Sequence, residues 1–461
     1  MNPRSFSHLP LSAEQLSNLE SLGYHNMTPV QLAALPGALE GEDLIAQART
    51  GSGKTAVFAL AMLARLDLNS PATQVLVLCP TRELSIQVSS ELRRIARHQQ
   101  NVTLATLYGG QAKSLQTQAL KKGAHIVVGT PGRVADLIEH GSLVLRSLSM
   151  LVLDEADRML DMGFMKELKQ ITRVLPRKRQ TLLFSATFPE NIQELSGHLQ
   201  RDPRRITVEE PNAAADIEQR VYRCAPEEKL EGLKTLLLET QPTAAVVFCN
   251  FKQSTIEVRT FLKNLGFSAA ALNGDLEQRD REDLLIQFKH QSCSVLIATD
   301  VAARGLDIKD LPVVINYELP DEPEVYVHRI GRTGRAGKRG IALSLCGERE
   351  RGKLAQINAY QKSSLKAESL GGLRPAAKSI PRPLHVTLSI SGGRKAKVRA
   401  GDILGALTAE GGIAGSEVGK IDVMDFMSYV AVVRAVATRA EKKLSASKIK
   451  GRSYKVKILS S

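Results

Sequence analysis

Short runs of apolar, mostly β-branched residues recur along the chain and alternate with longer stretches of helical periodicity. Continuous apolar strands that alternate with helices predict parallel sheets covered by helices on both faces. The pattern therefore predicts two α/β domains in succession. Their expected strands are 75–78, 126–128, 151–153 and 181–184, then 246–248, 295–297, 313–315 and 341–343.

Two segments interrupt this pattern. Positions 208–215 have little periodicity, and about 363–383 are rich in Gly, Ser, Pro and Lys, so both are interpreted as linkers. After the second linker the order becomes strand, helix, strand, strand, helix, strand, at 386–390, 401–408, 419–423, 429–433, 438–445 and 454–459. This βαββαβ order is a split βαβ frame, which RNA-recognition folds share with many others. We expect domains at 1–207, 218–362 and 384–461, with linkers at 208–217 and 363–383.

The composition is that of an ordinary folded protein, with 461 residues, 43% hydrophobic and 24% charged. These values exclude a disordered chain, a collagen and a disulfide scaffold. No apolar run approaches the roughly 18 residues of a membrane span, and the N-terminus lacks the apolar stretch of a secretory signal. The five cysteines form no C-x-x-C pair. We therefore expect a protein of the reducing cytoplasm without zinc.

The positive charge is concentrated at the end of the chain. Residues 384–461 hold fourteen Lys and Arg against six Asp and Glu, whereas the other 383 residues hold 48 against 42. A uniformly solvated surface would spread the excess more evenly. The last domain is therefore predicted to bind a polyanion, with nucleic acid as the first partner to test.

Residues 48–55, Ala-Arg-Thr-Gly-Ser-Gly-Lys-Thr, match a phosphate-binding P-loop except that Ala48 replaces the first glycine. Small residues let backbone N–H groups face phosphate oxygens, while Lys54 would reach the β- and γ-phosphates and Thr55 the Mg²⁺ ion. The predicted nucleotide-binding residues here are Thr50, Gly51, Ser52, Gly53, Lys54 and Thr55.

A second motif, the acidic sequence Asp-Glu-Ala-Asp at 154–157, follows the apolar segment 150–153. Its carboxylates therefore lie at the carboxyl end of a strand, where open α/β sheets bind ligands. Asp154 could hold hydrated Mg²⁺ together with Thr55, and Glu155 could orient the attacking water. An acidic turn that only caps a helix is the competing interpretation, and the preceding P-loop argues against it.

Together with the P-loop, this motif resembles the DEAD-box family of RNA helicases, and further motifs match the family in order across residues 6–335. The resemblance implies two RecA-like parallel-sheet domains in tandem plus a C-terminal βαββαβ RNA-recognition-like domain. It also implies ATP and Mg²⁺ as cofactors and RNA as partner. Phe6 and Gln31 fall in the family's adenine motif. An amide can pair with adenine N6 and N7, and an aromatic ring can stack on the base.

The resemblance assigns further roles around the phosphates. Ser185 and Thr187 end a strand, and their hydroxyls can hydrogen-bond Asp157. In the second domain, 300–307 and 328–335 match late motifs, with Asp307 on the ribose and Arg332 and Arg335 on the γ-phosphate. The predicted catalytic set is Lys54, Glu155, Arg332 and Arg335. Because it is split between two domains, hydrolysis should require their closure, and RNA and ATP should promote each other's binding.

An RNA track is expected beside this site. In the first domain it comprises Thr81, Arg82, Gly110, Thr130 and Arg133, and in the second Asn250, Gln278, Arg281 and Thr299. Contacts to phosphates carry no base information, so this track should be blind to sequence. Any one of these residues alone could be loop punctuation.

Specificity must then come from the last domain. Its middle strands offer only Tyr429 and Phe426 as aromatics, so base stacking on the sheet face is disfavoured and basic loops are favoured. The candidates are Arg394, Lys395, Lys397, Lys448 and Lys450. The stretches 401–408, 419–421 and 448–451 resemble the C-terminal domain of a bacterial subgroup of the family. That resemblance implies binding to a 23S ribosomal RNA hairpin of the peptidyl-transferase region during large-subunit (pre-50S) assembly.

Two other functions remain open from the sequence. One is a general RNA-binding chaperone or scaffold with a weak or decayed ATPase, and the other is a DNA translocase of the wider helicase superfamily. The presence of Lys54, Thr55, Asp154 and Glu155 argues against the first. The adenine motif and 130–133 argue against the second.

Overall fold

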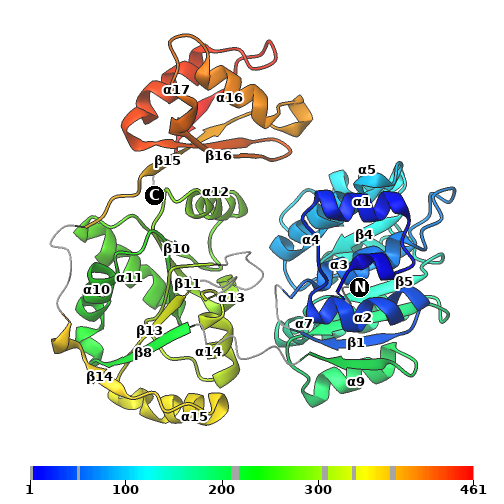
Figure 1. The fold of residues 1–461 in the computed structure, drawn as a ribbon, viewed down its shortest axis with the longest axis horizontal. Coiled ribbons are helices and arrows are strands. Elements are labelled where there is room, and N and C mark those ends of the chain that lie inside the picture. Colours follow the sequence, from blue (N-terminus) through cyan, green and yellow to red (C-terminus); the bar gives the residue numbers. More distant parts are fainter. Residues whose placement is uncertain are drawn as a thin grey trace. The chain divides into compact units, whose positions relative to one another are not determined.

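The structure is a computed structural model that describes residues 4–48, 52–208, 217–303, 310–334, 339–373 and 380–459. Contacts divide the chain into two compact units, Met1–Pro211 and the greater part of Asn212–Ser461. Figure 1 labels their elements. Within the described residues, no helix combines the length and the apolarity that crossing a bilayer demands.

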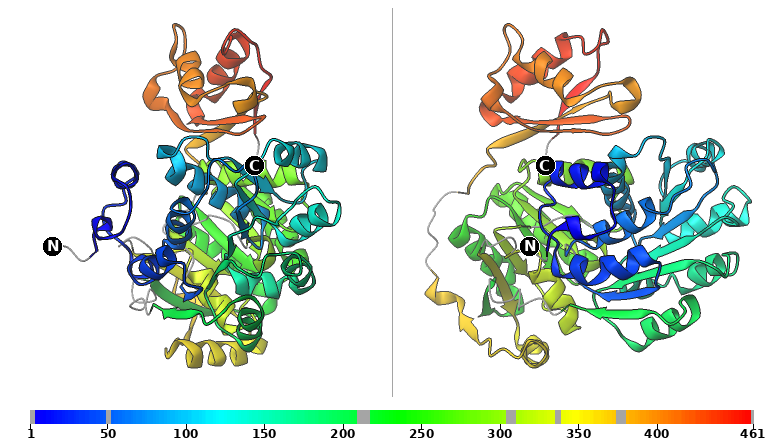
Figure 2. Two further views of the ribbon diagram at one scale, coloured as in Figure 1. Left: turned by 90° about the vertical axis from the view of Figure 1, so that its right-hand side faces the viewer. Right: turned by 45° about the vertical axis from the view of Figure 1, so that its right-hand side comes forward.

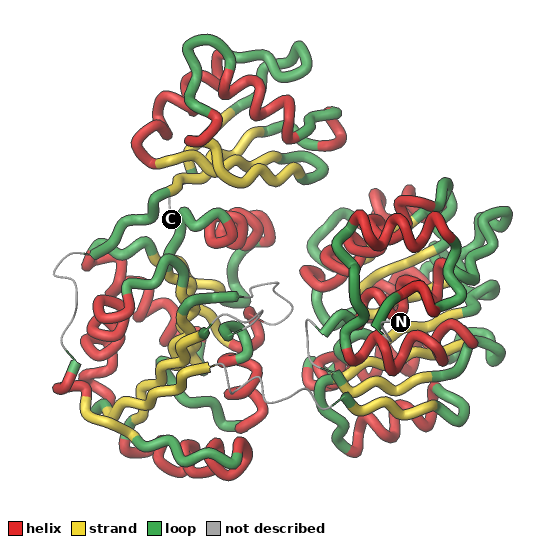
Figure 3. The backbone as a smooth tube through the Cα atoms, viewed as in Figure 1, coloured by secondary structure: helices red, strands yellow, loops and turns green. Residues whose placement is uncertain are grey.

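The first unit contains a seven-stranded parallel sheet in the order β3-β4-β2-β5-β6-β1-β7. Neighbouring residues of one strand belong to different cores, Val77 to one and Leu76 to the other, so helices bury both faces (Figure 3). The strands are β1 Leu44–Gln47, β2 Val75–Leu78, β3 Leu104–Leu107, β4 Ile126–Gly129, β5 Met150–Leu153, β6 Gln180–Ser185 and β7 Arg204–Thr207. The helices are α1 Ala13–Ser21, α2 Pro29–Glu40, α3 Lys54–Leu63, α4 Arg82–Ile95, α5 Lys113–Lys121, α6 Pro131–Glu139, α7 Ala156–Asp161, α8 Met165–Thr172 and α9 Glu190–Leu199.

The second unit begins with another seven-stranded parallel sheet, in the order β10-β11-β9-β12-β13-β8-β14. Its strands are β8 Ile217–Arg223, β9 Ala245–Cys249, β10 Ala269–Leu272, β11 Val295–Thr299, β12 Val313–Asn316, β13 Gly340–Cys346 and β14 Ala367–Ser369. Its helices are α10 Lys229–Thr240, α11 Lys252–Leu265, α12 Gln278–Lys289, α13 Asp300–Ala303, α14 Pro323–Ile330 and α15 Arg351–Gln361.

All eight strands expected from apolar runs are present, and the predicted tandem of α/β domains is confirmed. Strand β14 falls inside 363–383, the segment predicted to be a linker, and pairs with β8 at the sheet edge. Short edge strands need few apolar residues, because only part of their surface is covered. Most of the other predicted linker, 208–217, lies outside the described residues.

The C-terminal part of the second unit has the predicted βαββαβ order. Its antiparallel sheet runs β16-β17-β15-β18, and both helices cover the same face (Figure 2). Leu388, Val430, Ile403 and Leu444 are fully buried between the sheet and those helices. The elements are β15 His385–Ile390, α16 Ala400–Thr408, β16 Val418–Val423, β17 Ser428–Val433, α17 Ala437–Ala446 and β18 Val456–Ile458.

Candidate functional site

The carboxyl ends of all strands in the first sheet lie along one edge, because the sheet is parallel. The P-loop, the acidic motif and the segment with Ser185 and Thr187 follow or end β1, β5 and β6, which are neighbours in the sheet, whereas the adenine motif precedes β1. The predicted RNA motifs follow β3, β4 and β2, which are also neighbours. The sheet order alone thus sorts the two sets of residues into adjacent halves of a single edge.

The described end of the P-loop opens helix α3. Gly53 is the N-cap residue with φ +94°, a left-handed conformation that favours glycine. A Cβ there would lie within 2.5 Å of Gln31 Nε2, so the site also requires a residue without a side chain. The backbone N–H groups of the first turn of α3 suit an anion such as phosphate. The predicted contacts of Thr50 and Gly51 fall outside the described residues.

Lys54 and Asp154 form the buried base of this site. Lys54 Nζ donates to the Ala48 carbonyl at 2.9 Å and lies 3.9 Å from Asp154 Oδ1. Burial raises the pKa of the Asp154 carboxyl to about 6, although the charge of Lys54 opposes the rise. Asp154 Oδ1 is buried, and no group in the described residues donates a hydrogen bond to it. A buried carboxylate oxygen with spare lone pairs fits a hydrated Mg²⁺, the ion that Thr55 at the start of α3 is predicted to share.

Glu155 is held between strand and helix in a strained turn. Its backbone is left-handed, at φ 56° and ψ 54°, which is unusual for a residue with a side chain. The side chain is buried, and Glu155 Oε2 lies 3.0 Å from Arg158 Nη1. The carboxylate therefore keeps a fixed place at the sheet edge, as a group that orients a water must. Strain of this kind persists where the surrounding structure enforces it.

Asp157 links α7 to the end of β6. Its Oδ2 accepts from the backbone N–H groups of Ala186 and Thr187, both at 3.0 Å, and from the Thr187 hydroxyl at 3.1 Å. Burial alone would raise the pKa of Asp157, but these hydrogen bonds and the charge of Lys54 keep it below its ordinary value. Asp157 is thus an anion that clamps the 186–187 turn.

Ser185 does not make the contact with Asp157 that the sequence suggested. Within the described part of the chain its buried hydroxyl has no hydrogen-bond partner, and the Ala186 backbone amide donates to Asp157 instead. Three donors from residues 186 and 187 already fill Asp157 Oδ2. A backbone amide leaves no trace in a sequence motif, which is why the pattern pointed to the hydroxyl instead.

The residues of the predicted adenine motif contact the protein itself. Gln31 Oε1 accepts from the Thr28 amide at 2.9 Å, and Gln31 Nε2 donates to the Gly53 carbonyl at 3.1 Å. One N–H and one lone pair of the amide remain for a base. Phe6 is only 4% exposed and packs edge-on against Tyr24. Its stacking on adenine stays a prediction.

The predicted RNA residues of the first unit are tied to one another. The Arg82 guanidinium lies 4.5 Å from the centre of the Tyr108 ring, and Arg133 donates two hydrogen bonds to the Gln111 carbonyl. Both contacts fix the turn after β3, where Gly110 has φ +80°. Thr81 and Thr130 are the N-cap residues of α4 and α6, and only Thr81 caps with its hydroxyl. Three loops therefore form one connected surface of helix N-termini.

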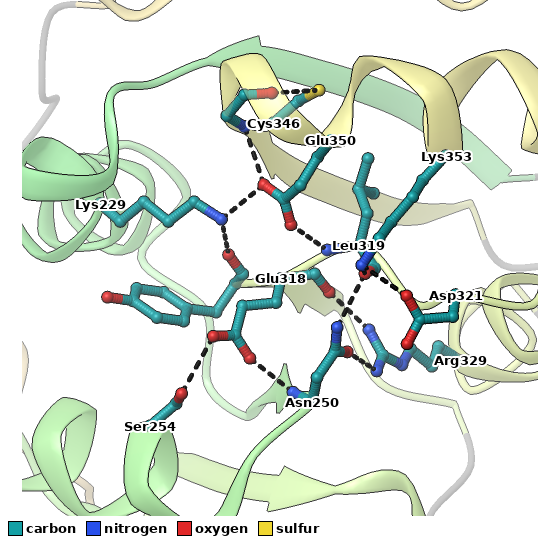
Figure 4. A network of polar contacts seen from close by, with 12 residues as sticks. Lys229, Asn250, Ser254, Glu318, Leu319, Asp321, Arg329, Cys346, Glu350 and Lys353 are labelled. Carbon is teal, nitrogen blue, oxygen red and sulfur yellow. Dashed lines mark hydrogen bonds and ion pairs between the residues drawn. The ribbon is translucent and has the colours of Figure 1, made fainter.

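In the second unit Arg329 takes part in a polar network, and Figure 4 draws its contacts with Asn250 and Glu318. This buried side chain donates to Asp300 at 2.6 and 2.7 Å, to Asn250 Oδ1 at 2.8 Å and to the Glu318 carbonyl at 2.7 Å. Glu318 in turn accepts from the Asn250 amide and the Ser254 hydroxyl. The sequence interpretation gave no role to Arg329 or Glu318. Their position after β12 and within 328–335 was the available signal.

The other predicted residues of the second unit hold local turns. Arg281 donates to the Ala302 carbonyl at 2.8 Å, and Thr299 accepts from the Ala302 amide. Gln278 bonds Glu282 within α12. Arg332 is buried at the end of α14. Asp307 and Arg335 lie outside the described residues.

The outer face of the C-terminal sheet is covered by α12 and the residues after it. Tyr429 is 3% exposed and donates to Asp283 at 2.7 Å. Asp422 lies 2.5 Å from Lys289 Nζ and 2.9 Å from His290 Nε2, and these contacts lower the pKa of Asp422 to about 2 against the effect of its burial. Tyr429 is therefore covered in this structure, and the expectation that bases do not stack on the sheet face stays a prediction.

The predicted cations of this domain differ in their surroundings. Arg394, Lys395 and Lys397 are exposed on the loop between β15 and α16. Lys448 is also exposed, whereas Lys450 lies 3.6 Å from Asp402. In the described residues no group of three or more His, Cys, Asp and Glu side chains could hold a metal ion, and all five cysteines are free and buried.

Comparison with known proteins matches three family descriptions in succession. They are "DEAD/DEAH box helicase" over residues 28–195, "Helicase conserved C-terminal domain" over 228–337 and "DbpA RNA binding domain" over 387–458. The chain is 49% identical to the ATP-dependent RNA helicase DbpA of Escherichia coli K12, over 97% of this chain and 98% of the relative. It is 38% identical to DbpA of Bacillus subtilis 168, over 98% of both.

Solved structures give the same result for the two parallel-sheet domains. S. cerevisiae Dbp5 bound to RNA and ADP BeF3 matches with a TM-score of 0.72 and 29% identity, covering 80% of this chain and 96% of that one. A Dbp5 variant bound to Gle1 matches with a TM-score of 0.66 and 30% identity over 79% and 95%.

Proposed function

This chain belongs to the DEAD-box family of ATP-dependent RNA helicases, and on that premise we propose that it remodels 23S ribosomal RNA during assembly of the large ribosomal subunit. The C-terminal domain would bind the hairpin of the peptidyl-transferase region. The helicase domains would then separate short duplexes nearby. This role places the enzyme in the cytoplasm, a compartment in which five free cysteines stay reduced.

The observation that supports this target most is the division of charge and surface in the C-terminal domain. Its exposed cations suit phosphates, and the sheet face on which RNA-recognition domains stack bases is covered by α12. Such a domain would recognise the shape of a folded RNA through its loops. The resemblance of 401–408, 419–421 and 448–451 to the C-terminal domain of a bacterial subgroup makes ribosomal RNA the first folded RNA to test, and residues 387–458 match the description "DbpA RNA binding domain".

For hydrolysis we assign each group a role according to its position. Lys54 and the N-terminus of α3 would bind the phosphates, with Thr50, Gly51 and Ser52 completing the loop. Glu155 would hold the attacking water. Bound Mg²⁺, held by Asp154 and Thr55, would neutralise phosphate charge. Arg332 and Arg335 belong to the second unit, so neither unit carries the full set and hydrolysis would require both.

The clamp between Asp157 and Thr187 would couple the two halves of the sheet edge. Asp157 is two residues from Glu155 and fixes the turn after β6 with three hydrogen bonds. The RNA loops after β2, β3 and β4 lie on the same edge. Displacement of one set would therefore be felt by the other through packed strands.

The test is ATPase activation of the full-length protein by fragments tiled along 23S ribosomal RNA, with 16S fragments of equal length as controls. The fragment with the peptidyl-transferase hairpin should activate at a concentration at least about tenfold lower, because recognition of its shape adds to phosphate attraction. Equal activation by all fragments would reject the ribosomal target. Absence of turnover with every RNA would favour the scaffold alternative.

A further inference from the structure

The cations of the C-terminal domain fall into two groups. Three of those on and around α17 are engaged within the protein: Arg439 lies 3.4 Å from Glu417, Lys443 donates to the Glu410 carbonyl, and Lys450 pairs with Asp402. On the loop after β15 the opposite holds. The exposed side chains of Arg394, Lys395, Lys397 and Arg399 have no partner in the part of the chain that the structure describes. Lys448, Arg452, Lys455 and Lys457 near the end of the chain are also exposed without a partner among the described residues, so the loop after β15 is one of two places with several unengaged charges.

This basic loop is joined to the turn between β16 and β17. The Arg394 amide donates to the Met424 carbonyl at 2.8 Å, and the Lys395 amide donates to the Asp425 carbonyl at 2.9 Å. Gly393 packs so closely on the turn that a Cβ would collide with the Met424 carbonyl oxygen. The neighbouring Gly392 accepts from the Ser428 hydroxyl. The basic loop and the turn are therefore one fixed surface, which we call the loop–turn surface (392–399 and 424–427).

The turn exposes apolar side chains beside these charges. Phe426 is 58% exposed and Met424 38% exposed, although a turn between two antiparallel strands is ordinarily polar. Neither side chain belongs to the core of the domain. An exposed aromatic ring that borders unengaged cations is the combination that single-stranded nucleic acid binds, because bases stack on the ring while cations hold phosphates.

We propose that the loop–turn surface is a nucleotide-binding site in which an unpaired base stacks on Phe426 and Met424. Arg394 and Lys395 bind the flanking phosphates. The proposal rests on the proposed RNA target. It locates the recognition of that RNA at the loop–turn surface, which lies at one edge of the domain. A protein partner fits less well. To bind beside four unengaged cations, it would need a strongly acidic segment next to an apolar one, whereas every nucleotide of RNA carries both a base and a charged phosphate.

The test uses the full-length protein, without nucleotide, and RNA hairpins that carry 2-aminopurine at single loop positions. Stacking on Phe426 should quench the fluorophore at one position, and Phe426→Ala should abolish the quench and weaken binding roughly five- to a hundredfold. Phe426→Tyr should retain both the fluorescence quench and the wild-type affinity. Leu404→Ala is the matched control, since Leu404 is 39% exposed on α16 of the same domain and should have no effect.

A second variant separates charge from stacking. Arg394→Ala with Lys395→Ala should weaken every hairpin alike and lower the slope of log K against log salt by about 1.4, near 0.7 for each lost phosphate contact. Unchanged binding and quenching in Phe426→Ala, for every hairpin tested, would overturn the proposal. If wild type treats ribosomal and unrelated hairpins alike while Phe426→Ala still weakens both, the stacking site stands and the ribosomal target fails.

Discussion

The edge of the first sheet and the face of the C-terminal sheet show opposite relations between fold and function. In the first sheet, the predicted phosphate, acidic and RNA motifs follow the carboxyl ends of parallel strands, so the topology gathers them, whereas the adenine motif with Phe6 and Gln31 precedes β1. In the C-terminal domain, the face that usually binds RNA in this fold is covered by contacts of Tyr429 and Asp422 with α12 and the residues after it. In this chain the fold therefore predicts the position of a site only where the ends of parallel strands form that site.

The difference has a chemical basis as well. Parallel strand ends present backbone groups and helix N-termini that phosphates need whatever else the protein does. A sheet face is simply a surface, and any neighbour of suitable shape and polarity can cover it. Binding must then move to loops, where exposed charge remains.

The largest expected effect concerns Glu155. Glu155→Gln keeps the shape of the side chain but removes its charge, so hydrolysis should fall about 10² to 10⁴-fold while ATP and RNA still bind. Turnover in RNA-stimulated ATPase assays and binding by filter retention check this. Glu139→Gln, on the surface of the same unit, should be neutral. Turnover equal to that of the wild-type protein would show that Glu155 is not catalytic. It would then contradict the view that the strand ends of the first sheet form the catalytic site.

The next effect concerns Arg329, which belongs to the network of Figure 4 and also pairs with Asp300 outside that view. Arg329→Met leaves Asp300 without its buried partner, and the free energy of unfolding of the second unit should fall by about 3 to 5 kcal/mol. Arg351→Met breaks only an exposed pair with Glu348 and should cost about 0 to 1 kcal/mol. Urea unfolding of the two variants measures both values. Equal losses would show that the network does not organise the strand ends of this sheet.

A smaller effect tests the covered sheet face. Tyr429→Phe removes the hydrogen bond to Asp283, which should weaken the contact with α12 by about 1.5 to 3 kcal/mol because the acceptor is charged. Faster hydrogen exchange in α12 and β17 would report it. Tyr454→Phe is the control, since the Tyr454 hydroxyl has no hydrogen-bond partner among the described residues.

RNA affinity should not fall in Tyr429→Phe or in Tyr429→Leu. If the leucine variant loses base stacking while Phe426→Ala does not, the sheet face binds RNA after all. The contrast between the two regions would then disappear.

The smallest effect is a pH dependence of nucleotide binding. Because the pKa of Asp154 is raised to about 6, the carboxyl takes up a proton as the pH falls below that value, and protonated carboxyl does not hold Mg²⁺. Affinity for Mg-ATP should therefore fall about tenfold per pH unit below pH 6 and level off above it. Calorimetric titration of the RNA-free protein measures it. Asp154→Asn should bind weakly at every pH, and a flat profile in wild type would contradict the assignment.

Much of the fold could be predicted, because apolar runs such as Met150–Leu153 predict buried strands. Ala269–Leu272 was missed, since three alanines read equally well as helix. At the site, side-chain motifs identified Lys54 and Asp154. The amide of Ala186 was not predictable, because a backbone donor carries no residue signature.

The covering of the C-terminal sheet was also beyond the sequence. Asp283 and Tyr429 are 146 residues apart, and neither belongs to a motif that suggests pairing. The scarcity of aromatics led to the prediction that RNA binds away from the sheet face. It could not indicate where, because the proximity of the basic loop to the turn 424–427 depends on two backbone hydrogen bonds.

The account assigns ATP hydrolysis to the two parallel-sheet domains and RNA selection to the C-terminal domain. The most direct test of this division is the ATPase activity of a chain that ends at residue 383. We expect turnover with saturating unstructured RNA to remain within about threefold of the full-length value, since every catalytic group precedes that residue. Preference for the fragment with the 23S peptidyl-transferase hairpin should vanish. A truncated chain that retains the full preference would contradict the account.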